Sequence, residues 1–157
     1  RGLQKDTAMN YARLNLSALY NATGKNNDAL KVLKDALLTD AKNDRIYFNM
    51  ALLYNEMKNP AKAEESLSKA IALKTNNPRV YYNYGLMLQQ NGKTKEAVGM
   101  LGKGLELSPL DADINYTLCV LYVQLNQIDK AKRYAGVLKK YYSGNPAYDK
   151  IVQQLGL

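Results

Sequence analysis

The sequence repeats with a period of 34 residues, and this period limits the fold more than any other feature of the chain. The clearest copy runs from Pro78 to Pro109, where two amphipathic stretches flank a turn at Asn91–Gly92. Every copy has alanine at its twentieth place, and these residues are Ala29, Ala63, Ala97 and Ala131. Small side chains at fixed places let neighbouring helices approach closely, so the period predicts helix pairs stacked one on the next.

The period divides the chain into four complete repeats and two ends. The repeats are predicted to span residues 10–43, 44–77, 78–111 and 112–145, followed by a capping helix over 146–157. A cap is expected because the last repeat would otherwise expose its apolar flank to water. Residues 1–9 fall on the last nine places of a preceding repeat, with Thr7 aligned on Pro109. We therefore expect the chain to be part of a longer protein; the alternative is a short N-terminal extension that frays.

Prolines and capping residues mark where the helices are expected to begin. The pairs Asn59–Pro60 and Asn77–Pro78 place proline at a first helical position, where it is tolerated. The other expected N-caps, whose side chains can accept a hydrogen bond from a free backbone N–H, are Asn26 or Asn27, Asp44 and Asp111. Each repeat is therefore predicted to hold two helices.

The composition argues against catalysis and against metal binding. The sequence has no histidine, which removes Ser-His-Asp and Cys-His catalysis and the usual general base near neutral pH. The single cysteine, Cys119, takes a small-residue place, so we interpret it as a buried spacer. One cysteine also excludes a disulfide within the chain. We predict no enzyme activity, no cofactor and no metal site.

Two local clusters have structural explanations as well. Asp111 and Asp113 flank a helix start, where capping and the helix dipole account for acidic residues. Gly99, Gly102 and Gly104 lie inside a helical pattern, so we expect close helix packing there rather than a phosphate-binding loop. Neither cluster predicts chemistry.

The charge of the chain permits, but does not specify, anionic partners. Its 22 basic and 14 acidic residues give a net charge of +8, which can attract acidic peptides, nucleic acid or a membrane surface. The basic residues are dispersed over all four repeats, so nucleic-acid binding is only a minor alternative. No apolar run approaches the roughly 18 residues needed to cross a bilayer. The sequence identifies neither the compartment nor the oligomeric state, and no small-molecule substrate is expected.

The period, the two helices per repeat and the small residues at the eighth, twentieth and twenty-seventh places resemble the tetratricopeptide repeat (TPR) family. The resemblance covers essentially the whole sequence. It implies an all-α fold, a right-handed α-solenoid of antiparallel helix pairs that forms a single TPR superhelix domain. The two ends depart from the family's pattern. In the first repeat, Arg13 takes a place where the family prefers a large aromatic residue and Ser17 one where it prefers Gly or Ala; in the fourth, Leu138 takes a small-residue place.

The resemblance also implies that the first helix of each repeat lines a concave groove. In this register Asn15, Asn49 and Asn83 form a row, similar to the asparagine ladder of another TPR superhelix. Their amides would hold the backbone of an extended peptide, because each offers donors and an acceptor. The other groove residues implied by the register are Phe48, Tyr82 and Tyr116, Arg45 and Arg79, and Asn55 and Gln89. The rings would supply flat contact area, and the arginines would pair with carboxylates.

The function implied by this groove is protein interaction. We predict a non-catalytic module that binds an extended peptide or partner segment, and the alternative is a structural scaffold or spacer of a larger protein. Under that alternative, the row of asparagines has no ligand and is present only because asparagine suits a solvent-exposed helix surface. The family's carboxylate clamp for chaperone C-termini is incomplete, since Leu14, Ala18 and Asn83 depart from its motif. That partner class is therefore not implied.

Overall fold

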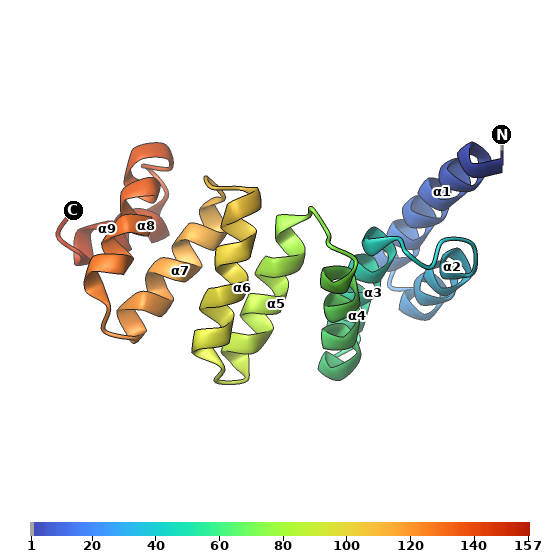
Figure 1. Ribbon diagram of the computed structural model, residues 1–157, viewed down its shortest axis with the longest axis horizontal. Helices are drawn as coiled ribbons and strands as arrows, with labels where there is room; N and C mark the ends of the chain where they lie inside the picture. The colour runs from blue at the N-terminus through green and yellow to red at the C-terminus, as the bar shows by residue number, and fades with distance from the viewer. Residues whose placement is uncertain (1) are drawn as a thin grey trace. The chain divides into compact units, whose positions relative to one another are not determined.

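The computed structural model describes residues 2–157, with side chains described from Ala8 onward. Nine α-helices and no strand are found in these residues (Figure 1): α1 (Gly2–Ala22), α2 (Asn26–Thr39), α3 (Asp44–Glu56), α4 (Pro60–Ala72), α5 (Pro78–Gln90), α6 (Thr94–Leu107), α7 (Ala112–Gln124), α8 (Ile128–Tyr141) and α9 (Pro146–Gln154). The predicted all-α fold is confirmed.

The helices gather into two compact halves, an N-terminal half up to Thr75 and a C-terminal half from Asn76 to Leu157. In the N-terminal half, α1 packs on α2, α2 on α3 and α3 on α4, and α1 also contacts α3. In the C-terminal half, each helix from α5 to α9 packs on the next one in the chain. This sequential packing is what a repeat protein needs, because each repeat buries its apolar face on its neighbour.

Small residues let the paired helices approach each other. The alanines at the twentieth place of the four repeats are all buried, with Ala97 0% exposed. A Cβ atom added to Gly85 would lie 2.8 Å from Cγ of Leu101, and one added to Gly104 would lie 2.8 Å from Cδ1 of Ile114. A side chain at Gly85 would press on the branch point of Leu101, whereas one at Gly104 would meet the terminal methyl of Ile114, which can shift more easily.

Close packing does not explain the other two glycines of α6. A Cβ atom on Gly99 or on Gly102 would meet no atom within 4 Å, so the sequence-based expectation of tight packing at these two residues is wrong. Both face open space on the helix, where glycine only weakens the helical conformation.

Side-chain caps start three of the helices at the expected places. Asn59, Asn77 and Asp111 each accept a hydrogen bond from a backbone N–H in the first turn of α4, α5 and α7. Two expected caps are wrong. Asn43, not Asp44, caps α3, because its Oδ1 accepts the N–H of Arg45 at 3.1 Å. Helix α2 begins at Asn26 after Lys25 and has no side-chain cap.

The N-terminal helix differs from the other first helices. The alignment of Thr7 with Pro109 places a helix end there, whereas α1 runs without a break from Gly2 to Ala22. Unlike proline, threonine keeps its backbone N–H, so nothing at this place stops the helix. The division of residues 1–9 from the first repeat stays a prediction; Arg1 lies outside the described residues.

One side of α1 is left open to solvent. Leu16 and Leu19 are 40% and 60% exposed, whereas their counterparts one repeat later, Met50 and Leu53, are buried. Met50 and Leu53 lie on α3, which packs on the second helix of the preceding repeat, and α1 has no such neighbour among the described residues. None of the helices in these residues combines the length and apolar character needed to cross a membrane.

Candidate functional site

The candidate site is the side of the first helices that the register predicts to face inward. We call it the first-helix surface, and we describe its two parts separately. In the N-terminal half its residues lie on α1 and α3, and in the C-terminal half they lie on α5, α7 and α9.

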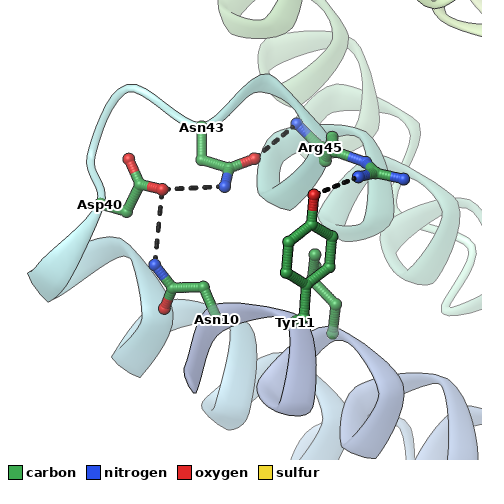
Figure 2. A pocket seen from close by; sticks show the side chains of 6 residues that line it. Asn10, Tyr11, Asp40, Asn43 and Arg45 are labelled. Atoms are coloured by element: carbon green, nitrogen blue, oxygen red, sulfur yellow. Dashed lines mark hydrogen bonds between the residues drawn. The ribbon is translucent and has the colours of Figure 1, made fainter. Parts of the chain in front are cut away.

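Near the start of α3, an arginine and a tyrosine one period apart are stacked. The guanidinium of Arg45 lies 5.5 Å from the ring centre of Tyr11, and its Nη1 donates to the Tyr11 hydroxyl at 3.3 Å. Figure 2 shows this pair beside Asn43, whose side chain caps α3. The predicted groove residue Arg45 is thus positioned by α1, and its other N–H groups remain available.

A polar network holds the loop between α2 and α3 against α1. Asp40 accepts hydrogen bonds from Asn43 at 2.9 Å and from the nearly buried Asn10 at 3.4 Å (Figure 2). These residues, together with Tyr11, Leu14 and Arg45, surround a hollow of about 50 Å³. This hollow is several times smaller than the next one, so it is a weaker candidate for a peptide side chain.

A larger hollow lies between α1 and α3, further along both helices. Its volume is about 230 Å³, and it is lined by Ser17, Ala18, Asn21, Ala22, Asn49, Leu52 and Leu53. The predicted ladder residue Asn49 is half-buried there, and its amide forms no hydrogen bond within the described part of the chain. Short side chains on α1 create this space, because Ser17, Ala18 and Ala22 do not reach across to α3.

Asn21, which has the same place in the repeat as the predicted groove residues Asn55 and Gln89, contributes a second amide to this hollow. Its Nδ2 donates to Oε1 of Glu56 at 3.1 Å, while its Oδ1 is buried without a hydrogen-bond partner. The other predicted residues of this half are not in the hollow: Asn15 and Asn55 are exposed to solvent and Phe48 is half-buried. Asn15 and Asn49 are therefore both on first helices, but only Asn49 lines a hollow.

In the C-terminal half, Arg79 is already paired within the chain. Its Nη2 donates to Oδ2 of Asp113 at 2.8 Å, its Nη1 lies 3.7 Å from Asp111, and its guanidinium lies 4.9 Å from the ring centre of Tyr82. The hydrogen bond to Asp113 raises the pKa of Arg79. Arg79 therefore already pairs with carboxylates of its own chain, which leaves it less to offer a ligand than the register alone suggests.

Asp113, for which the sequence indicates only a role at a helix start, joins three helices. Besides Arg79 of α5, it accepts a hydrogen bond from the hydroxyl of Tyr148 on α9 at 3.4 Å. Burial, followed by the charge of Asp113, raises the pKa of Tyr148. The Arg79–Asp113 ion pair could have been predicted from the sequence, because the two residues are one period apart and carry opposite charges.

The ladder residue of α5 uses part of its amide locally. Nδ2 of Asn83 donates to the carbonyl of Arg79 at 2.7 Å, one helical turn back. Thr117, at the same place in the next repeat, does the same with the carbonyl of Asp113 at 2.8 Å. Asn83 therefore keeps its carbonyl oxygen and one N–H for a ligand, which is less than a free amide offers.

Tyrosine rings cover part of the first-helix surface in the C-terminal half. The rings of Tyr116 and Tyr148 lie 5.3 Å apart and are tilted, and Tyr148 meets Tyr142 edge-on at 6.3 Å. Tyr82 packs against the apolar core that surrounds Leu101 and Leu118. Both predicted ring residues, Tyr82 and Tyr116, are half-buried, and Gln89 of α5 is half-buried as well.

A third hollow, of about 270 Å³, lies between α7 and α9. It is lined by Tyr116, Val120, Val123, Gln124, Ala147, Lys150, Ile151 and Gln154. Of these residues only Tyr116 is a predicted site residue. Val123 shares its place in the repeat with the predicted groove residues Asn55 and Gln89. The lining residues of α9 were not predicted, because that helix was expected only to cap the array.

The chemistry available on this surface is recognition. Within the described residues no three His, Cys, Asp or Glu side chains form a group that could hold a metal ion. Burial raises the pKa of Cys119 to about 11, so its thiol stays protonated and is a poor nucleophile near neutral pH. What the surface offers is amides, rings and two hollows large enough for a side chain.

Comparison with known proteins identifies the family. The family model described as tetratricopeptide repeat matches residues 20–84 and 88–155, so the chain belongs to the tetratricopeptide repeat family. The predicted α-solenoid of TPR type is thereby confirmed. A search of curated proteins found no match.

Solved structures with the same fold share little sequence with this chain. A MamA protein superposes with a TM-score of 0.80 at 20% identity, covering 94% of this chain and 80% of that one. YrrB, described as a TPR protein with an unusual peptide-binding site, gives 0.78 at 17% identity, with 91% and 74% covered. PilF of Pseudomonas aeruginosa gives 0.72 at 23% identity, with 98% and 79% covered. At these identities the likeness establishes the fold alone.

Proposed function

We propose that this chain is a non-catalytic protein-interaction module whose first-helix surface holds an extended peptide or partner segment. The observation that carries the proposal is the α1–α3 hollow, in which the amide of Asn49 has no partner inside the described chain. An amide that faces open space on a helix bundle can take both an N–H and a carbonyl of a peptide backbone.

The amount and kind of free surface support the same proposal. The hollows of about 230 Å³ and 270 Å³ each have space for about one large side chain, at roughly 30 Å³ per displaced water. Amides beside tyrosine rings suit a peptide, because rings bury apolar side chains at a low entropy cost and amides orient the backbone. YrrB, which has the same fold, is described as having an unusual peptide-binding site.

The test is binding of a randomised peptide library to the wild type and to the double variant Asn49→Ala, Asn83→Ala. We expect the selected peptides to bind the double variant at least about tenfold more weakly, as the loss of about 1.4 kcal/mol in hydrogen bonds would give. Asn27→Ala is the matched control, because Asn27 is an exposed asparagine on the second helix of a repeat. Circular dichroism melting of each variant checks that the fold is retained.

Two results would contradict the proposal. Equal binding by wild type and double variant would remove the asparagines from the site. The absence of binding to any library peptide, combined with salt-sensitive retardation of single-stranded RNA, would favour an electrostatic nucleic-acid function instead.

A further inference from the structure

We propose that the hollow between α7 and α9 selects an aliphatic side chain that is adjacent to an acidic residue in the bound peptide. In this arrangement the aliphatic group enters the hollow and the carboxylate pairs with Lys150. The inference rests on the proposed peptide-binding function and names the kind of peptide that this part of the surface takes.

The lining of the hollow is suited to an aliphatic group. Ile151 forms its floor with only 8% of its surface exposed, and the half-buried Val120 and Tyr116 belong to the same apolar cluster. Val123 is 39% exposed at the edge. An exposed valine beside a buried isoleucine and a half-buried valine is apolar surface that a ligand can cover, which is favourable in proportion to the area removed from water.

The charge in the lining of the hollow itself favours a carboxylate ligand. Outside the lining, Arg79 of α5 is more than compensated by Asp113 and Asp111, and these three residues together carry a net charge of −1. Lys150, in contrast, has no carboxylate oxygen within ion-pair distance among the residues described. It is therefore the cation of the hollow that still lacks a counter-charge.

The acidic residue that is nearest to Lys150 in sequence is occupied elsewhere. Asp149 accepts the backbone N–H of Gly144 through both oxygens, at 3.0 and 3.3 Å, so it holds the start of α9 in place. The remaining polar groups at the edge are the amides of Gln124 and Gln154, which can donate to a carboxylate or to a peptide carbonyl. A lysine or arginine in the ligand would meet Lys150 without any compensating carboxylate.

The experiment uses four pools of fluorescein-labelled ten-residue peptides with random flanks and a fixed central pair. The pairs are Leu-Glu, Leu-Gln, Leu-Lys and Ala-Glu, and binding is measured by fluorescence anisotropy at low and moderate salt. We expect the Leu-Glu pool to bind about threefold to tenfold more tightly than each other pool, the range expected for a half-exposed ion pair or one aliphatic group. Higher salt should reduce the preference for Glu over Gln but leave the preference for Leu over Ala.

Variants assign each preference to its residue. Lys150→Ala should abolish the preference for Glu over Gln and keep the preference for Leu over Ala. Val123→Ser should abolish the preference for Leu over Ala and keep the preference for Glu over Gln. Both side chains are exposed, so neither substitution is expected to affect folding. Lys140→Glu, on the exposed side of α8, is the control for a general charge effect.

The outcomes separate this inference from the function on which it rests. If the four pools bind equally, or if Lys140→Glu removes the acidic preference as well as Lys150→Ala does, the subsite is overturned while peptide binding survives. If no pool binds and the randomised library also fails, the proposed function itself falls, and the subsite falls with it.

Discussion

At the scale of single residues, the turn inside each repeat requires a left-handed backbone conformation. The same place is filled by Gly24, Lys58, Gly92 and Asn126, and all four have a positive φ, between 54° and 74°. Glycine adopts this conformation without a steric cost and asparagine tolerates it, whereas a lysine Cβ crowds its own carbonyl. Lys58 is therefore the strained member of the set.

Replacing that lysine should stabilise the protein. We expect Lys58→Gly to raise the free energy of unfolding by about 0.5–1 kcal/mol. The substitution relieves the backbone strain, and this gain is partly offset because glycine loses more conformational entropy on folding. Asn126→Gly, the matched control, should gain less. Urea denaturation measures both, and a lower stability for Lys58→Gly would contradict a left-handed conformation at this turn.

Two glycines of the third repeat, one on each of its helices, give opposite expectations for replacement by alanine. Gly99→Ala should stabilise α6 by up to about 1 kcal/mol, because alanine favours the helix and meets no atom within 4 Å. Gly85→Ala should destabilise the protein by about 1–3 kcal/mol, because the new methyl group would collide with Leu101. Thermal melting of the two variants decides the matter; shifts of the same sign would be inconsistent with this packing.

The buried thiol gives a prediction about pH. Burial raises the pKa of Cys119 from 9.0 to about 11, so folding favours the neutral thiol. Its contribution to stability is present below pH 9 and is lost as the pH rises towards 11. We expect Cys119 to resist a thiol reagent such as Ellman's reagent at about pH 8 in the native state and to react at once in denaturant. Rapid native reaction would show that the thiol is not buried.

At the scale of helices, one place in the repeat separates a packed first helix from an open one. Leu121 of α7 is 0% exposed because α7 packs on α6, whereas Leu19 at the same place of α1 is 60% exposed. We expect Leu121→Ala to cost about 2–5 kcal/mol and Leu19→Ala less than about 0.5 kcal/mol. Chemical denaturation of this matched pair is the check, and equal costs would mean that α1 is covered in solution.

The helices and their stacking could be predicted because they depend on the repeat itself. The alanines of the twentieth place, the turn glycines and the Asn–Pro helix starts each act within a few residues or across one fixed helix contact. The open side of α1 could not be predicted from Leu16 and Leu19, since their pattern is that of any first helix. Exposure there depends on whether a neighbour is present, which a periodic sequence does not encode.

The site was predicted less completely than the fold, for a related reason. Register places a residue on the first-helix surface, but it does not tell whether that residue is already paired. Arg79 is paired with Asp113 and Asn83 with a backbone carbonyl, so both offer a ligand less than the sequence suggested. Lys150 was not predicted, because α9 was expected only to cap the array. That it has no ion-pair partner among the described residues can be seen only in the structure.

At the scale of the whole molecule, we propose that the first helices bind a partner and that the second helices only support them. Each half has its own hollow on the first-helix surface, α1–α3 in one and α7–α9 in the other. The positive charge, in contrast, is concentrated on no single hollow, and Lys132, Arg133, Lys139 and Lys140 lie exposed on the second helix α8. A partner bound by charge alone would therefore be found on a different set of helices.

The most direct test is to map a bound peptide by NMR. The ¹⁵N-labelled chain is titrated with a peptide selected from the library, and the change in each backbone and side-chain amide signal is recorded. We expect the largest changes to fall on first helices, including the side-chain amide of Asn49 and the backbone amides of Tyr116 and Lys150. Changes confined to the second helices, above all to the exposed lysines of α8, would contradict this expectation.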